Sequence, residues 1–219
     1  MADLRVNAYV DGFNLYYGLK TRGWGQFYWI DPFRLIQQLI RPGFSLNRVR
    51  YFTAKVRQPH EKRERQNAFL EAIGATSDAE IVYGKFYSKP RWCGECNASW
   101  RSFEEKMTDT AIGVNLVADA FTDDFDVAYM VGGDTDIVPA IKMVRRHFPG
   151  KRLEAWFPPR RKNQEVTDAC HDEGQINGEH LKPAVMPDRI LLKSGLYVER
   201  PATWIQCPKS DGSDPADRR

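Results

Sequence analysis

Long hydrophobic runs are absent from this chain. No stretch of its 219 residues approaches the roughly 18 consecutive apolar residues that a membrane helix needs. The first ten residues, "MADLRVNAYV", lead directly into a strand-like segment and lack the pattern of a signal peptide. Four cysteines are too few for a disulfide framework in a chain of this length. These absences predict a soluble, cytoplasmic protein with no membrane partner.

Several catalytic signatures are also missing. The sequence contains no GxxxxGK[ST] phosphate loop, no GxGxxG after its first strand and no GxSxG nucleophile elbow. A phosphatase with an aspartyl nucleophile would carry a second Asp two residues after Asp11, and that position is Phe13. Nucleoside-triphosphate hydrolysis, dinucleotide binding and serine hydrolase chemistry therefore have no support in the motifs.

The composition is that of an ordinary globular protein. Hydrophobic residues make up 42% and charged residues 28%, and the net charge of +3 is compatible with a nucleic-acid partner without requiring one. We expect one domain over residues 1–180, with a Cys- and Trp-rich insertion at 88–104. Residues 181–219 then form a C-terminal extension, whose last segment, "SDGSDPADRR", is expected to be disordered.

Strand-like and helix-like segments alternate along the chain. The expected strands are Leu4–Val10, Arg48–Val56, Ala79–Ser88, the run "FDVAYMVGG" and Lys151–Pro159. Helical spacing and capping residues predict helices over Asp31–Ile40, His60–Ile73, Thr108–Phe121 and Asp136–Phe148. The insertion is expected to be irregular, and a last short helix and edge strand are expected within "VTDACHDEGQING". This alternation predicts an α/β fold with a mostly parallel sheet of about five strands, covered on both faces.

Acidic residues follow two of these strands. Asp11 comes after the first strand, Asp134 and Asp136 come after the fourth, and Asp109 opens the helix that leads into the fourth. If those two strands are neighbours, the carboxylates converge at the edge where open α/β sheets bind ligands. Crowded carboxylates repel one another, and a hard divalent cation such as Mg²⁺ relieves the repulsion. The alternative for any one of these aspartates is a helix cap. Asn14 also has two interpretations: it either positions Asp11 or a phosphate, or forms an Asx-turn or helix cap.

Three segments together resemble the NYN domain family, a branch of the PIN-like nucleases. They are "YVDGFNLYYGL", "EEKMTDTAIGVNLVADAF" and "FDVAYMVGGDTDIVPAIKMVRRHFPGKRLEAWFPP", and the resemblance runs from Arg5 to Asn177. The resemblance implies a three-layer α/β/α domain. It also implies a ribonuclease, specifically an endoribonuclease, whose activity depends on Mg²⁺ or Mn²⁺. Carried over by position, Asp11, Asp109 and Asp134 would be metal ligands, and Asp136 a ligand or a base that positions water.

The sequence departs from the family pattern at three positions. Gly133 and Thr135 stand where relatives carry serines, so one hydroxyl near a phosphate is lost and Thr135 retains the other. Asn115 stands where many relatives carry a further Asp, so the sequence does not decide whether a second metal position is retained. Asp119, one turn later, is either a substitute ligand or a solvated helix residue.

The pair Cys93 and Cys96 has the CxxC spacing of a zinc ligand pair. Structural zinc needs four ligands, and Cys170 with His171 would complete the set if the C-terminal part folds back across the sheet. His60, His147 and Cys207 are other candidates. A pair of free thiols in a reducing cytosol is the alternative.

Basic and aromatic residues flank the predicted strand ends. Arg57, Arg160 and Arg161 are candidate phosphate contacts, and a basic rim would attract RNA to an acidic centre. Single-stranded bases could stack on aromatic side chains, although Trp156 is expected in the core and Tyr16 and Tyr17 against the first helix. The candidates for stacking are Tyr16, Tyr17, Trp24, Trp92 and Trp156.

The leading hypothesis is a Mg²⁺- or Mn²⁺-dependent ribonuclease that acts on single-stranded RNA. A homodimer is the expected oligomer. Two alternatives stay open. One is an RNA- or protein-binding module with a weakened site, which Asn115 favours. The other is a small-molecule phosphohydrolase, for which a narrow, closed pocket would be the signature.

Overall fold

Six parallel strands form the central sheet of the protein. The computed structural model describes residues 3–96 and 98–205. The sheet order is β3-β2-β1-β6-β7-β8, and every neighbouring pair is parallel. The strands are β1 (Leu4–Asp11), β2 (Phe44–Thr53), β3 (Glu80–Tyr83), β6 (Val127–Val131), β7 (Arg152–Phe157) and β8 (Asp172–Gln175). The expected mostly parallel α/β fold is confirmed, and the expected edge strand, β8, brings the sheet to six strands.

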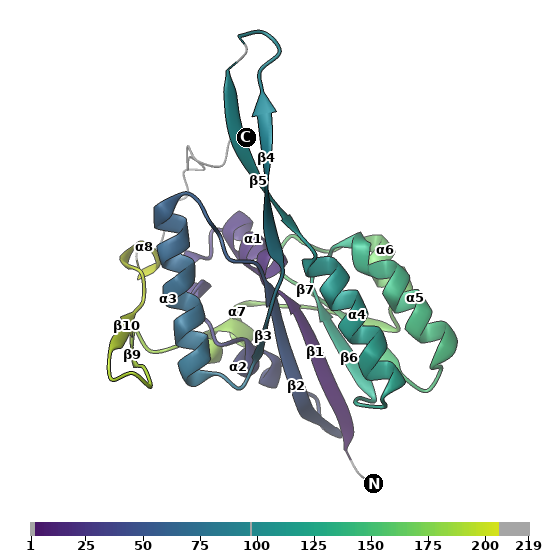
Figure 1. Ribbon diagram of the computed structural model, residues 1–219. Helices are drawn as coiled ribbons and strands as arrows, with labels where there is room; N and C mark the ends of the chain where they lie inside the picture. Colours follow the sequence, from purple (N-terminus) through teal and green to yellow (C-terminus); the bar gives the residue numbers. More distant parts are fainter. Residues whose placement is uncertain (1–2, 97, 206–219) are drawn as a thin grey trace.

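Helices cover both faces of this sheet, which gives three layers (Figure 1). The first face carries α1 (Gly12–Arg22), α2 (Pro32–Gln37), α3 (His60–Thr76), α7 (Gly178–Leu181) and α8 (Ala202–Ile205). The second face carries α4 (Thr108–Phe121), α5 (Val138–His147) and α6 (Gln164–Ala169). Three short 3₁₀ turns, η1 (Gly25–Phe27), η2 (Thr135–Ile137) and η3 (Lys182–Ala184), complete the connections.

The alternation of side chains along β1 builds two separate cores. Val6, Ala8 and Val10 are buried against the first helix layer, whereas Tyr9 is buried against the second. Because both faces of the strand are covered, nearly all of its side chains are buried.

Strand order reverses between β1 and β6. The chain leaves β1 for β2 on one side, and it leaves β6 for β7 on the other. These two strands are hydrogen-bonded neighbours, with Val10 opposite Val131. The connections after them, α1 and η2, therefore start side by side at the carboxyl edge, where ligands bind in open α/β sheets.

The insertion forms a hairpin. The expectation that it would be irregular is therefore wrong. β4 (Lys85–Trp92) pairs antiparallel with β5 (Ser99–Lys106), and Figure 1 shows the pair projecting away from the sheet. Lys85, Tyr87, Lys89, Arg91 and Trp92 of β4 are all exposed. Because the described side chains of β4 are exposed, this strand lacks the alternation of apolar and polar residues from which strands are recognised.

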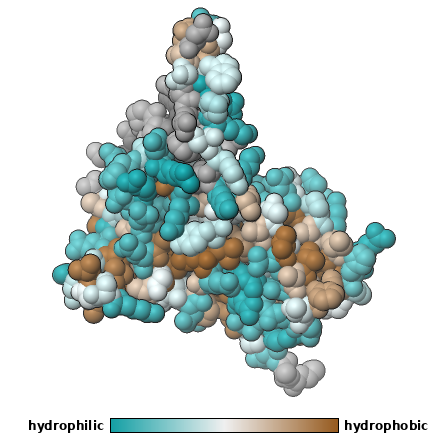
Figure 2. Space-filling model, viewed as in Figure 1, coloured by the Kyte–Doolittle hydropathy of each residue, from teal (hydrophilic) through white to brown (hydrophobic). Residues whose placement is uncertain are grey.

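Residues after 180 pack onto the first core. Leu181, Met186 and Trp204 are buried there, and a small sheet of β9 (Arg189–Leu191) and β10 (Tyr197–Glu199) adds Ile190 and Val198. Figure 2 shows hydrophobic surface at the lower left over this small sheet, while the visible side of α3 is hydrophilic. The segment expected to be disordered lies outside the described residues. No helix in the described part of the chain is both long and apolar enough to span a bilayer.

Candidate functional site

Asp11 occupies the junction of β1 and α1. It is the last residue of the strand, and its Oδ1 accepts a hydrogen bond of 2.9 Å from the Asn14 amide, so it also caps the helix. Its side chain is buried, with 7% of the residue exposed. Burial raises the pKa of Asp11 to about 7, and the charges of Asp109 and Asp134 contribute to the rise, against the lowering effect of the amide hydrogen bonds. Asp11 is therefore a helix cap, and it also lines the pocket described below.

Asp134 follows β6 and caps η2. Its Oδ1 accepts a hydrogen bond of 3.0 Å from the Asp136 amide. The Asp136 side chain is exposed and does not line the pocket described below. The paired aspartates therefore occupy different positions: Asp134 at the pocket and Asp136 outside its lining.

Asn14 connects the two junctions. Its side-chain oxygen accepts a hydrogen bond of 3.1 Å from the Gly133 amide, in the loop after β6. The start of α1 is thereby linked to the loop that carries Asp134. The Asn14 side chain contacts Gly133, and only its backbone amide contacts Asp11, so a role for the side chain in positioning Asp11 or a phosphate stays a prediction.

Asp11, Asp109 and Asp134 line a single pocket of about 190 Å³, which we call the acidic pocket. They come from the ends of β1 and β6 and from the first turn of α4. The other lining residues are Phe13, Asn14, Tyr17, Thr108 and Arg161. Three carboxylates from separate parts of the sequence thus converge as the strand ends predict.

Arg161 is the basic residue of the acidic pocket. Its guanidinium lies 5.9 Å from the centre of the Tyr17 ring, a cation–π distance. Its carbonyl oxygen approaches the loop after β6 so closely that a Cβ at position 133 would lie 1.9 Å from it. The loop therefore leaves no room for a side chain at position 133.

The other basic candidates lie elsewhere. Arg57 is exposed in the segment after β2, and Arg160 is exposed with a left-handed φ of 57°. Neither lines the acidic pocket, and Thr135 does not line it either. Phe13 and Thr108 also line the pocket, although neither was a candidate site residue from the sequence. Phe13 lies within the segment "YVDGFNLYYGL" that resembles the family.

The donor set of the acidic pocket suits a hydrated cation. Within residues 3–96 and 98–205, no group of three or more Asp, Glu, His or Cys side chains is arranged to hold a metal ion directly. Mg²⁺ usually retains several waters and binds through one or two carboxylates, so three converging carboxylates around a polar pocket fit it in that form. Burial is the main cause of the raised pKa of Asp11, and the charges of Asp109 and Asp134 add to it; a cation would offset those charges.

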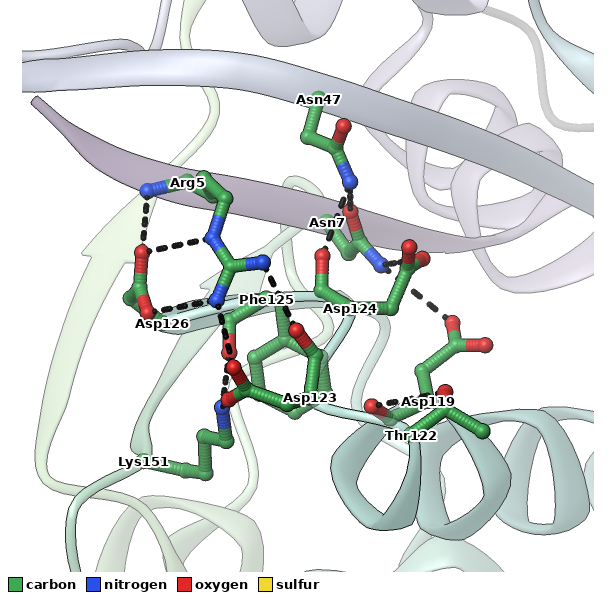
Figure 3. Close-up of polar contacts among 10 residues, drawn as sticks. All are labelled: Arg5, Asn7, Asn47, Asp119, Thr122, Asp123, Asp124, Phe125, Asp126 and Lys151. Atoms are coloured by element: carbon green, nitrogen blue, oxygen red, sulfur yellow. Dashed lines mark hydrogen bonds and ion pairs between the residues drawn. The ribbon is translucent and has the colours of Figure 1, made fainter.

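Asp119 is neither a solvated helix residue nor a substitute ligand. It is buried, pairs with Arg50, and accepts a hydrogen bond of 2.6 Å from the Tyr9 hydroxyl. Figure 3 shows Asp119 beside Asn7. The side-chain amide of Asn7 donates hydrogen bonds to both Asp119 and Asp124. This network belongs to the second core and the amino-terminal half of β1. Asn115 donates to the Ala111 carbonyl of its own helix and does not line the acidic pocket.

The four proposed zinc ligands are not assembled. Cys93 and Cys96 lie in the turn of the β4–β5 hairpin, where Cys96 is exposed and Trp92 is 69% exposed. Cys170 is buried in the second core, where burial raises the pKa of its thiol to about 12, and His171 Nδ1 accepts from the Leu153 amide. Cys207 lies outside the described residues. The described part of the chain therefore supports the free-thiol alternative.

The aromatic candidates have separate surroundings. Trp156 packs on Tyr129 and His180, in agreement with a core position. Tyr16 contacts Tyr17 and Tyr28, and Trp24 packs on Phe27. Of the candidates, Tyr17 alone among the described lining residues reaches the acidic pocket.

A parallel α/β/α fold with carboxylates converging at its switch point is the architecture expected of PIN-like proteins. The chain belongs to the NYN domain family, whose pattern matches residues 5–174.

Known proteins that are similar to the chain include the following two. The 6-hydroxy-3-succinoylpyridine 3-monooxygenase HspA of Pseudomonas putida is 28% identical over 180 residues, covering 66% of this chain. The chain spans 56% of the length of that relative. A crystal structure of a Vibrio parahaemolyticus protein of unknown function shares the fold with a TM-score of 0.54, at 18% identity, covering 81% of this chain and 95% of the other.

Proposed function

We propose that the acidic pocket hydrolyses phosphodiester bonds of RNA with the help of Mg²⁺ or Mn²⁺. The observation that carries the proposal is the convergence of Asp11, Asp109 and Asp134 on one pocket at the switch point of the sheet. Membership of the NYN domain family supports it.

In this proposal the three carboxylates hold the metal, and the chain supplies the positioning. The bound metal would lower the pKa of an attacking water and stabilise charge on the phosphate. Asn14 keeps Asp11 and the Asp134 loop in register through its two hydrogen bonds. Arg161 brings a positive charge to the rim of the pocket, where it can bind a phosphate oxygen.

Single-stranded RNA fits the surroundings of the pocket. Phe13 and Tyr17 offer aromatic surface at the lining, and the mildly basic chain favours a polyanion. A cytoplasmic location and a homodimer accompany this proposal as further predictions.

The test is RNA cleavage by the Asp134→Asn variant in the presence of Mn²⁺. We expect cleavage to fall at least about 100-fold, the scale for loss of one preorganised charged group, with RNA binding and the circular dichroism spectrum unchanged. Asp168→Asn, an exposed residue of α6, is the matched control and should cleave at the normal rate. Asp136→Asn should reduce the rate less than Asp134→Asn, because Asp136 is exposed outside the pocket lining. Equal cleavage by Asp134→Asn and the unchanged protein would remove the assignment.

A second candidate function is a reaction on a small substituted pyridine. Its basis is the monooxygenase activity in the name of the Pseudomonas putida relative, together with an apolar cavity beside the acidic pocket that is lined by Tyr16, Tyr28 and Tyr51. The measurement is consumption of 6-hydroxy-3-succinoylpyridine with dioxygen and a two-electron donor, followed by mass spectrometry. Turnover of this compound, with no RNA cleavage, would favour the second candidate over the first.

A further inference from the structure

A second cavity, of about 110 Å³, lies between α1, α3 and the end of β2. We call it the aromatic cavity. Most of its surface is apolar, and its ring-bearing walls include Phe13, Tyr16, Tyr28, Tyr51, Phe69 and Trp204. These residues come from five different segments of the chain, so no single stretch of sequence indicated the cavity.

The rings form a packed inner wall. Phe69 meets Tyr51 at 5.9 Å and 71°, and it meets Trp204 at 6.1 Å and 71°, both edge-to-face arrangements. Tyr51, Phe69 and Trp204 are all buried. At about 110 Å³ the aromatic cavity is smaller than the enclosed cavity of roughly 150 Å³ that is known to bind benzene. It opens to solvent, however, so a planar ring can enter it in part.

The rim of the aromatic cavity is basic and ordered. Lys20, Lys62 and Arg65 line it, and no acidic residue occurs among its lining residues in the described part of the chain. Gln66 on α3 holds the adjoining segment in place. Its Oε1 accepts a hydrogen bond of 2.7 Å from the Val56 amide, and its Nε2 donates one of 3.0 Å to the Ala54 carbonyl. The cavity thus combines apolar walls with a positive entrance.

The aromatic cavity adjoins the acidic pocket. Phe13 and Tyr17 line both of them. A Cβ at Gly12 would lie 2.5 Å from the Tyr51 hydroxyl, so the inner wall reaches the residue directly after Asp11. A ligand in the cavity would therefore be held next to the carboxylates.

We propose that the aromatic cavity binds a planar heteroaromatic ring that carries an anionic group. The ring lies between the aromatic walls, and the anion meets Lys62 and Arg65 at the rim. Two sources share this chemistry: a nucleotide of an RNA strand and a free heteroaromatic acid. Binding at this cavity is independent of whether the acidic pocket cleaves RNA.

The experiment is calorimetric titration of the full chain with four compounds. Uridine 5′-monophosphate and pyridine-3-carboxylate carry both ring and anion, ribose 5-phosphate lacks the ring, and pyridine-3-carboxamide lacks the charge. We expect at least one of the first two to bind about tenfold or more tighter than both controls, a difference that one good set of contacts supplies. The tighter of the two identifies the source. Absence of saturable binding by both, or equal binding by ribose 5-phosphate, overturns the proposal.

Val56→Trp and Arg65→Ala locate the binding, and Val114→Trp and Asp134→Asn serve as controls. Val56→Trp places an indole in the cavity and should abolish the binding, whereas Val114→Trp, at a site 62% exposed on α4, should leave it intact. Arg65→Ala, on a half-buried rim residue, should weaken binding of the anionic compounds about tenfold even if Val56→Trp fails to fold. Unchanged affinity in Arg65→Ala overturns the assignment to this cavity. Asp134→Asn should retain the binding, so failure of the RNA cleavage test and failure of this one are distinguishable.

Discussion

The side-chain oxygen of Asn14 accepts a hydrogen bond from the Gly133 amide, 119 residues further along the chain, at 3.1 Å. Asn14 lies in the first turn of α1, and Gly133 lies in the loop after β6. Because β1 and β6 are neighbouring strands, this bond sets the relative position of the two segments that carry Asp11 and Asp134.

Loss of the Asn14 side chain should weaken both the fold and the site. In Asn14→Ala the Gly133 amide loses its acceptor, and we expect the free energy of unfolding to fall by about 1–2 kcal/mol. RNA cleavage should fall more than stability explains, since Asp134 loses its support. Urea denaturation and cleavage rates measure the two effects. Asn115→Ala is the matched control, because that side chain bonds only to Ala111 of its own helix among the described contacts. An equal loss in both variants would contradict the role of Asn14.

A serine at position 133 should be harmful in this chain. The added Cβ would lie 1.9 Å from the Arg161 carbonyl oxygen, so one of the two backbone segments must move. We expect Gly133→Ser to lower the free energy of unfolding by about 1–3 kcal/mol, the range for overpacking. Gly150→Ser meets no atom within 4 Å and should be close to neutral. Thermal denaturation of the two variants decides the matter, and a neutral Gly133→Ser would show that the loop can adjust.

Asp11 should make stability depend on pH when divalent cations are absent. The unfolded chain loses this proton near pH 3.8, whereas the folded chain retains it until about pH 7. The folded state binds more protons between these values, so stability falls as the pH rises from about 4 to 7 and then levels off. At about 1.4 kcal/mol per pH unit the full loss is of the order of 4 kcal/mol.

The difference between unchanged protein and Asp11→Asn isolates this effect. Asn retains the capping function but cannot ionise, so the variant should be the more stable of the two at pH 8. Added Mg²⁺ should raise the stability of the unchanged protein at pH 8 and have little effect on Asp11→Asn. Parallel pH profiles for the two proteins would show that Asp11 titrates normally.

The buried pair of Asp119 and Arg50 should matter more than its exposed counterpart. Arg50 is 7% exposed, and Asp119→Ala leaves its buried charge without that partner, which we expect to lower stability by about 3 kcal/mol or more. Asp123 pairs with Arg5 at 3.3 Å and also with Lys151, but its side chain is 75% exposed. Asp123→Asn, which tolerates the left-handed φ of 56° at this position, should therefore change stability by about 1 kcal/mol or less. Figure 3 shows both carboxylates in one region, which makes them a matched pair. Denaturant midpoints at equal slope provide the comparison, and similar losses would refute the argument from burial.

Local signals in the sequence were sufficient for much of the framework. In "DPF", Asp31 caps α2 and Pro32 starts it, as expected from residues whose backbone preferences act over a few positions. The apolar run before "GGDTD" is a fully buried strand, β6. The hairpin of β4 and β5 was missed because the described side chains of β4 are exposed and follow no alternation of apolar and polar residues. Asp119 of α4 was misread because its partners, Tyr9 and Arg50, lie far away in the sequence, on β1 and β2.

The amino-acid sequence by itself determined the α/β class, the helix caps and the presence of carboxylates just beyond two strands. These features depend on side-chain size, polarity and backbone preference within a few residues. Tertiary structure alone decided that β1 and β6 are neighbours, that Asp134 lines the pocket while Asp136 lies outside its lining, and that Gly133 has no space for a side chain. It also decided that rings from five segments enclose one cavity beside the carboxylates. Contacts between residues far apart in the chain depend on how the layers pack, and no local pattern encodes them.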